Sequence, residues 1–273
     1  MNVIAQNVRR DIEGELQQIE RVYGVAVLYA CESGSRAWGF ASPDSDYDVR
    51  FLYVRPRDWY LSVNLESRRD VIERPISDLL DISGWDLRKA LSLFRKSNPP
   101  LHEWLASPIV YRQQGRVAAR LQQLAVEAYN PVSAHYHYLS MAHTNYRAMS
   151  GERVRRKKYL YVLRSLLAVQ WIEQARGVVP MEFATLVEQL VPESPLQRTI
   201  AELLAEKRAG GEVDRGPRLP VLDDFIDREF LRHGRTTKVD SRPKLDVDRL
   251  NELFRETLAA DAPRAAVTSR AAV

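Results

Sequence analysis

The chain has 273 residues, of which 45% are hydrophobic and 28% charged, and this is ordinary for a globular protein with one large or two small domains. Its formal charge of +4 fits polyanionic partners such as triphosphates or RNA but is too small to indicate one by itself. The single cysteine, Cys31, excludes an internal disulfide framework and a multi-cysteine zinc site, and the lack of a signal-peptide pattern or a long apolar run predicts a cytoplasmic protein without a membrane partner.

The first elements alternate between helix and strand. Apolar residues at three- and four-residue steps predict a one-sided helix over 3–22, which Gly24 is expected to end. The apolar run 25–32 predicts a strand in which Cys31 is a small buried core residue. Gly34-Ser35 then turns the chain into a short helix, and a loop with Pro43 leads to a second strand over 47–54.

The segment up to the double proline continues this mixed pattern. Residues 59–65 are compatible with a short helix or a strand, 70–73 and 79–83 predict strands, and 86–96 predicts a helix that Asp86 caps. Asn98-Pro99-Pro100 is expected to end that helix, because proline disrupts a helix interior.

From Gln113 onward the pattern is almost entirely helical. Predicted helices cover 113–127, 132–149, 153–177, 181–189, 195–209, 222–233 and 247–259, with one loop marked by 210–211 and 216–217 and another over 234–244. Residues 261–273 have no apolar periodicity and are expected to form a frayed tail. We therefore predict an α+β fold, in which a mixed sheet with flanking helices over 1–110 is followed by a helical bundle over 111–260.

Two aspartates stand one residue apart at the start of the second predicted strand. Asp46 and Asp48 would point to the same face, and two carboxylates held together suit a shared hard divalent cation. Gly34 and Ser35 open a helix after a strand, where free backbone N–H groups attract phosphate. Either feature alone is typical of a surface turn, but their order, strand, Gly-Ser, helix, Ser-Asp-x-Asp, strand, favours a nucleoside triphosphate site.

These motifs resemble a known superfamily. G-S-R (34–36) and S-D-Y-D-V-R (45–50) are similar to the signature of the DNA polymerase β-type nucleotidyltransferases. With G-W-D-L-R-K-A-L (84–91), K-S-N-P (96–99) and E-W-L-A-S-P (103–108), the chain resembles more narrowly the bacterial and phage members named for association with RNA-repair ligases. The resemblance implies a polymerase β-like catalytic domain over 1–110 and a helical substrate- and nucleotide-binding domain over 111–260.

A third carboxylate would complete a two-metal site, and three acids compete for this place. Burial of Leu80 and Ile82 on one strand face turns Asp81 to the other, and the resemblance also puts the third acid there. Asp86 is better explained as a helix cap and Glu73 as a solvated edge residue.

Several neighbours of the acids have two interpretations. Ser35 is expected to bind phosphate, while Arg36 either adds a charge-assisted contact or faces solvent. Ser45 is expected to orient the loop and Tyr47 to point into the core. Arg50 shares the face of the acids, where it would buttress them or form an ordinary salt bridge.

Other positions enter through the resemblance. It implies that Lys89 reaches a phosphate, and it matches Asn98 and Glu103, which a turn and a helix start explain equally well. The family's helical half closes the nucleotide cleft with lysine and tyrosine side chains. Lys158, Tyr161 and Arg164 share one face of the predicted helix 153–177, and would bind triphosphate or base, hold an RNA backbone or form a solvated basic face.

The histidines do not predict a metal site. His135 and His137 are two residues apart, which places them on different sides of a helix, and with His143 they lack an acidic partner at ligand spacing. We interpret them as core or surface residues.

The leading hypothesis is a nucleotidyltransferase dependent on Mg²⁺ (or Mn²⁺), which transfers a nucleoside monophosphate from an NTP to an acceptor hydroxyl. Asp46 and Asp48 would bind metal, and Asp81 would bind metal and activate the acceptor. The resemblance favours an RNA or tRNA 3′ end as acceptor. A toxin-type enzyme that modifies a protein, and a non-catalytic nucleotide- or RNA-binding module, remain the alternatives.

Overall fold

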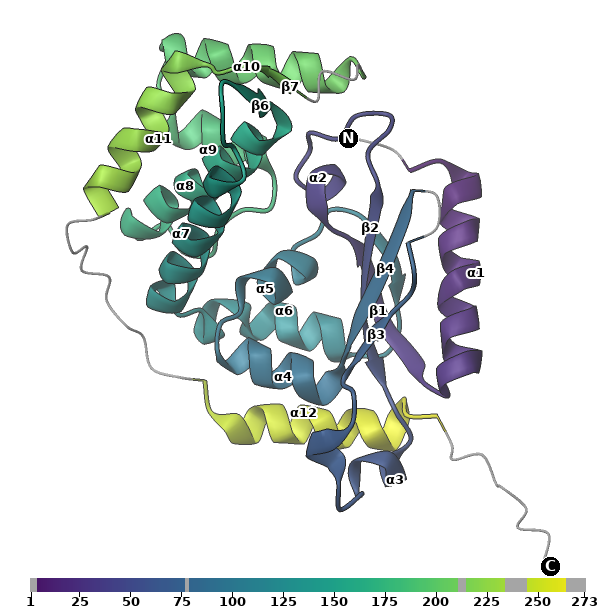
Figure 1. The fold of residues 1–273 in the computed structure, drawn as a ribbon. Helices are drawn as coiled ribbons and strands as arrows, with labels where there is room; N and C mark the ends of the chain where they lie inside the picture. The colour runs from purple at the N-terminus through teal and green to yellow at the C-terminus, as the bar shows by residue number, and fades with distance from the viewer. Residues whose placement is uncertain (1–3, 77–78, 211–214, 234–244, 264–273) are drawn as a thin grey trace, which may run out of the picture.

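The fold combines a five-stranded mixed sheet with a group of helices beside it (Figure 1). In the computed structural model, the residues described are 4–76, 79–210, 215–233 and 245–263. This architecture confirms the α+β class. Among the described residues, no helix combines the length and apolarity needed to cross a membrane.

The sheet has the order β3-β4-β2-β1-β5. Its strands are β1 (Ala26–Glu32), β2 (Tyr47–Val54), β3 (Val71–Glu73), β4 (Leu80–Asp86) and β5 (Val110–Gln113). Strands β2 and β4 are parallel, and the other neighbouring pairs are antiparallel. The central position of β2 puts the predicted acids in the middle of the sheet, where strands on both sides can present side chains to them.

Both faces of the sheet are covered (Figure 1). Helix α1 (Gln6–Tyr23) packs Ile12, Leu16 and Ile19 on one face. The other face is covered by α4 (Leu87–Arg95), α5 (Pro99–Leu105), α6 (Val117–Ala128) and α12 (Val247–Ala260). Cys31 lies in this second core, fully buried, as predicted. We call these helices and strands β1–β5 the sheet half.

The remaining helices form what we call the helical half. It contains α7 (Pro131–Arg147), α8 (Lys157–Glu173), α9 (Phe183–Leu190), α10 (Pro195–Arg208) and α11 (Pro220–His233), with a two-stranded sheet of β6 (Arg153–Arg155) and β7 (Arg215–Pro217). Helix α8 is buried on nearly every side, so it forms the centre of this half.

One prediction for the sheet half needs correction, and two others gain detail. Residues 110–113 pair with β1 as strand β5, so the predicted helix over 113–127 begins later, at Val117. The predicted helix 86–96 ends at Arg95, before Asn98-Pro99-Pro100 as expected, and these residues also start a second helix, α5, because Asn98 caps it and prolines fit a first turn. The segment 59–65, for which a short helix or a strand was expected, begins in the short helix α3 (Arg57–Tyr60) and ends at Leu65 in a 3₁₀ turn, Leu65–Ser67.

Two further corrections concern the helical half. The predicted helix 153–177 begins at Lys157, because 153–155 form β6, and the predicted loop at 216–217 belongs to its partner β7. Gly211, the loop 234–244 and most of the tail 261–273 lie outside the described residues.

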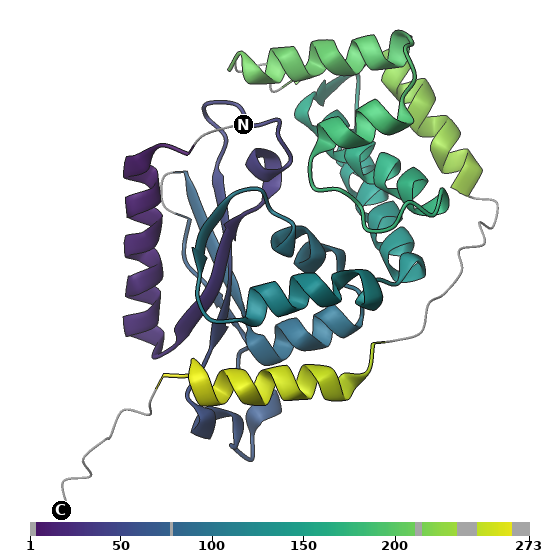
Figure 2. The same ribbon diagram turned by 180° about the vertical axis from the view of Figure 1, so that it is seen from behind.

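The two halves interlock. Trp38 and Phe40, which follow α2 (Gly34–Ala37), pack into the core of the helical half. Helix α12, the last helix among the described residues, instead returns to the sheet half, where it lies along α4 and α6 (Figure 2). The predicted boundary between two domains at residue 110 stays a prediction. Helices α6 and α12 follow residue 110 in sequence but pack with the sheet.

Candidate active site

The turn at Gly34 lies directly against Asp48. Gly34 has φ +58°, and a Cβ atom there would lie 2.8 Å from Asp48 Cγ and closer still to Oδ2. The Ser33 N–H donates to the Asp48 carbonyl at 2.8 Å, which ties the turn to β2. Only a residue without a side chain fits here, so the predicted Gly-Ser turn and the acid pair form one unit.

The third candidate acid reaches the same place through strand register. Asp81 on β4 is the direct partner of Asp48 on β2. Arg50 joins them, with its Nη2 at 3.1 Å from Asp48 Oδ1 and 2.8 Å from Asp81 Oδ2. Burial raises the pKa of Asp48, Arg50 opposes the shift, and the charges of Asp81 and Asp46 add to it. Negative charge is therefore concentrated at this point of the sheet.

The other two candidates lie elsewhere. Asp86 caps α4, as predicted, by accepting the Arg88 N–H at 2.8 Å, and its second oxygen accepts the Tyr60 hydroxyl. Glu73 is exposed on the edge strand β3 and pairs with Arg69. Of the three acids considered, Asp81 is the one that the fold places beside Asp48.

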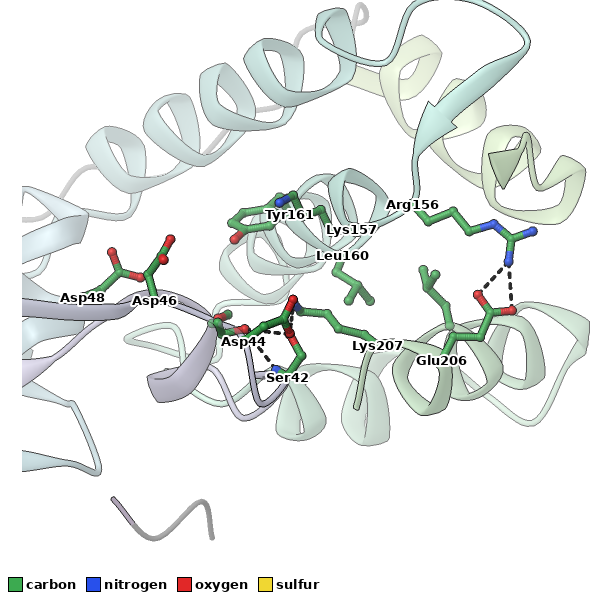
Figure 3. A pocket seen from close by; sticks show the side chains of 13 residues that line it. Ser42, Asp44, Asp46, Asp48, Arg156, Lys157, Leu160, Tyr161, Glu206 and Lys207 are labelled. Atoms are coloured by element: carbon green, nitrogen blue, oxygen red, sulfur yellow. Dashed lines mark hydrogen bonds and ion pairs between the residues drawn. The ribbon is translucent and has the colours of Figure 1, made fainter. Parts of the chain in front are cut away.

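Asp46 and Asp48 open onto a cavity of about 280 Å³ between the two halves, while Asp81 lies outside its lining (Figure 3). Asp46 and Asp48 lie at one end, and Arg156 with Glu206 lies at the other. The sheet-half wall consists of Ser35, Ser42, Asp44, Ser45, Asp46 and Asp48; the helical-half wall consists of Arg156, Lys157, Leu160, Tyr161, Leu203, Glu206 and Lys207. Carboxylates therefore face a wall that carries three cationic side chains.

The cationic wall is held by contacts to both halves. Lys207 Nζ donates to Ser42 Oγ at 3.4 Å, and burial followed by the nearby Lys157 lowers the pKa of its ammonium group. Hydrogen bonding from Ser42, with weaker contributions from Lys207 and Lys157, lowers the pKa of Asp44. Arg156 is paired with Glu206 at 2.6 Å. Lys207 and Lys157 were not predicted, because α10 is remote in sequence and helix α8 starts later than expected.

Arg36 does not face solvent, which was one of its two predicted positions. It is buried, with Nε donating to the Asp46 carbonyl at 3.1 Å and Nη2 donating to the Ser45 carbonyl, and its guanidinium lies 3.8 Å from the Tyr47 ring centroid. Tyr47 is consequently half-buried under Arg36 instead of in the core. Ser45 Oγ accepts the Ser42 N–H at 3.0 Å, so Arg36 and Ser45 together hold the loop that carries Asp46.

The residues predicted on helix α8 separate. Tyr161 lines the cavity and packs edge-on against Trp38, and burial, with the charges of Asp48 and Asp46, raises the pKa of its phenol. Lys158 does not line the cavity; its Nζ donates to Asn145 Oδ1 at 3.0 Å and lies 5.5 Å from the centroid of the Tyr161 ring. Arg164 is buried and bound to Glu103 at 2.9 Å.

Lys89 and Glu103 also lie apart from the cavity. Lys89 pairs with Asp70 at 2.8 Å in a second cavity next to α4. Glu103 is buried in the last turn of α5, not at a helix start, and accepts hydrogen bonds from Tyr138, Arg164 and Trp38. It thus joins α5 to the core of the helical half.

Sequence reasoning missed Glu32, at the end of β1. One oxygen accepts the Asp48 N–H at 2.8 Å, the other accepts the Tyr111 hydroxyl, and burial raises the pKa of this carboxyl to about 7. An acid that ends an otherwise apolar strand was the available signal. Glu32 positions the Asp48 backbone from behind.

The arrangement fits divalent cations and polyphosphate. Three carboxylates offer the oxygen ligands that Mg²⁺ and Mn²⁺ prefer, and their crowding leaves negative charge that Arg50 balances only in part. The facing cationic side chains suit phosphate groups. Because Gly34 has no side chain, its backbone can lie directly against the Asp48 carboxylate.

Comparison with known proteins gives three findings. A model of the RNA repair pathway DNA polymerase beta family matches residues 8–256. The uncharacterized protein YcgL of Bacillus subtilis (strain 168) is 49% identical over 253 residues, which cover 92% of this chain and 96% of that protein. A crystal structure of a nucleotidyltransferase-like protein from Exiguobacterium sibiricum 255-15 is similar over 90% of this chain and 80% of that one, with 13% identity and a TM-score of 0.30.

Proposed function

The chain belongs to the RNA repair pathway DNA polymerase beta family, and from this premise we propose that it transfers a nucleoside monophosphate from an NTP to an acceptor hydroxyl and releases pyrophosphate. Family membership confirms the resemblance predicted from the motifs around Gly34 and Asp48. The proposal rests above all on one observation: Asp81 is the strand partner of Asp48, beside a cavity whose opposite wall is cationic.

Each group has a role in this proposal. Asp46, Asp48 and Asp81 would hold Mg²⁺ (or Mn²⁺), which when bound neutralises charge on the phosphates and on the attacking oxygen. Asp81 takes the proton of the acceptor hydroxyl, whose oxygen forms a bond to the α-phosphorus as the bond to the bridging oxygen breaks. Arg50 keeps Asp48 and Asp81 in register.

The triphosphate has partners on both walls. We assign its binding to Gly34 and Ser35 on the sheet side and to Lys157 and Lys207 on the helical side, which stabilise the leaving pyrophosphate. Tyr161, at the cavity wall between them, is the stacking surface for the base or ribose. Lys158 and Lys89 take no part in this assignment, because their ammonium groups are engaged outside the cavity.

An RNA or tRNA 3′ end is the proposed acceptor, since the family is described by an RNA repair pathway. The test incubates the protein with each of the four NTPs, labelled at the α-phosphate, with Mg²⁺ or Mn²⁺, and with total RNA or total protein. Labelled RNA is the expected product, and it should disappear in Asp48→Asn and Asp81→Asn. Glu73→Gln is the matched control, because it removes a considered but distant acid and should label normally.

Other outcomes identify the alternatives. Labelled protein without labelled RNA would establish a protein-modifying enzyme. NTP binding without pyrophosphate release under any of these conditions would establish a binding module and refute the transfer reaction.

A further inference from the structure

Three helices of the helical half bring two histidines and a carboxylate together away from the reaction cavity. His135 of α7, Glu173 at the end of α8 and His233 at the end of α11 each offer one ligand atom, and these atoms all lie within 4.8 Å of one another. His135 Nε2 is 3.2 Å from Glu173 Oε1, and His233 Nδ1 is 3.3 Å from the same oxygen. Glu173 thus stands between two imidazole nitrogens.

The two separations between Glu173 and the histidines match those of metal ligands. Bonds of about 2.0–2.2 Å from Zn²⁺ to nitrogen and oxygen, at tetrahedral angles, place neighbouring ligand atoms about 3.3–3.5 Å apart. The cluster is enclosed, since the side chains of His135, Glu173 and His233 are 6%, 11% and 2% exposed. His233 Nδ1 is buried and, although close to Glu173, makes no hydrogen bond of acceptable geometry. A buried nitrogen without a hydrogen-bond partner, aimed into the cluster, is available to a cation.

The surrounding groups orient the three candidates. Arg232 Nη1 binds the other oxygen of Glu173, Oε2, at 2.6 Å, which leaves Oε1 facing the histidines. Arg232 Nη2 lies 2.7 Å from Glu229 and 3.1 Å from His233 Nε2, and Glu229 lies 3.8 Å from the same nitrogen. Metal binding through His233 Nδ1 puts the ring proton on Nε2, so Arg232 must release that nitrogen, and Glu229 is then the carboxylate that can accept the proton as an outer partner. With neutral histidines, two carboxylates and one guanidinium leave a net negative charge, which a bound cation would offset.

We propose that His135 Nε2, Glu173 Oε1 and His233 Nδ1 bind one divalent transition metal ion of the Zn²⁺ class, with water as the fourth ligand. The site joins α7, α8 and α11. Glu173 follows Tyr161 by twelve residues on α8, about 18 Å along the helix axis at 1.5 Å per residue, so this ion is separate from those of the proposed transfer reaction. The sequence analysis found no acidic partner for His135 at ligand spacing, and Glu173 of the neighbouring helix α8 supplies one.

The test uses the full-length chain without a histidine tag, stripped of metal with a chelator. Zn²⁺ is titrated against a chromophoric chelator, and Co²⁺ is titrated separately to follow its visible absorption, which reports nitrogen ligands and coordination number. Both titrations are repeated in Asp48→Asn, so that metal bound by the reaction cavity is recognised. One Zn²⁺ per chain should bind in both backgrounds.

His135→Gln is the decisive variant, because an amide can still hydrogen-bond Glu173 but is a poor metal ligand. Zn²⁺ affinity should fall by about 100-fold or more, since even outer-partner changes cost 10–100-fold. His143→Gln is the matched control: it lies on the same helix but stacks on Phe230, 4.2 Å between ring centroids, and should bind Zn²⁺ normally. Equal binding by the two variants, or no binding by the wild type, would overturn the proposal.

Discussion

Replacement of Gly34 by alanine tests whether the glycine turn sets the position of Asp48. The added Cβ would lie 2.8 Å from Asp48 Cγ, whereas ordinary contact begins at 3.4 Å, so the carboxylate must move by at least about 0.6 Å. A displacement approaching 1 Å in a reacting constellation costs about 100-fold in rate. We therefore expect Gly34→Ala to lower nucleotidyl transfer by about 10–100-fold.

The same substitution also strains the backbone, and a second glycine separates the two effects. Gly34 and Gly24 have φ of +58° and +61°, but a Cβ at Gly24, at the end of α1, meets nothing within 4 Å. Both variants should lose about 1–2 kcal/mol of unfolding free energy, the cost of a left-handed alanine. Only Gly34→Ala should lose activity.

Urea unfolding gives the stability of each variant, and pyrophosphate release or label incorporation gives its rate. If Gly34→Ala keeps the wild-type rate while Asp48→Asn is inactive, the contact between the turn and the carboxylate has no functional meaning. If both glycine variants lose activity equally, general destabilisation explains the loss.

Three further predictions concern other buried charges. Burial raises the folded-state pKa of Glu32 to about 7 from 4.5, so its contribution to stability is present at low pH and is lost as pH rises through 7. The wild-type free energy of unfolding should therefore fall by about 3 kcal/mol between pH 4.5 and 8, and Glu32→Gln should remove this fall. Urea unfolding across this pH range measures it, and the same pH dependence in the variant and the wild type would contradict the prediction. Glu103→Gln leaves the buried Arg164 charge without its carboxylate and should lower the free energy of unfolding by about 3–5 kcal/mol. Adding Arg164→Met should restore most of this loss, whereas additive losses in the double variant would show that the two residues are uncoupled. Lys207→Met should weaken NTP binding in calorimetry by about 10–100-fold, the worth of a charged hydrogen bond, while Lys158→Met, outside the cavity wall, should not; equal effects would move the phosphate site.

The sheet half was predictable where information is local. Strand β2 has the predicted bounds, and the parity of alternate residues placed Asp46, Asp48 and Arg50 on one face before any partner strand was known. The same parity turned Asp81 away from Leu80 and Ile82. Strand β5 was missed because its pairing with β1 joins residues 79 to 84 positions apart, and nothing in the short run 110–113 distinguishes it from a helix start.

The far wall of the cavity could not be predicted from sequence. Lys207 faces Ser42 only because α10 packs across the loop of the sheet half, and this contact spans 165 positions. Because helix α8 starts at Lys157 instead of Arg153, Lys157 lines the cavity and Lys158 does not. The cluster of His135, Glu173 and His233 likewise depends on three helices whose packing no local pattern encodes.

Because α12 packs on the sheet half, the core of that half cannot be completed during synthesis until α12 has been made. Leu250 and Leu253 complete a core whose first strand emerges from the ribosome more than two hundred residues earlier, and Phe254 packs on Tyr60 with 5.0 Å between ring centroids. The part of this core that α12 covers therefore stays exposed in the nascent chain until residues 247–260 have been translated. A truncation between α11 and α12 would keep every residue that lines the cavity but would leave apolar surface of the sheet half exposed, and we expect such a chain to be bound by chaperones or degraded.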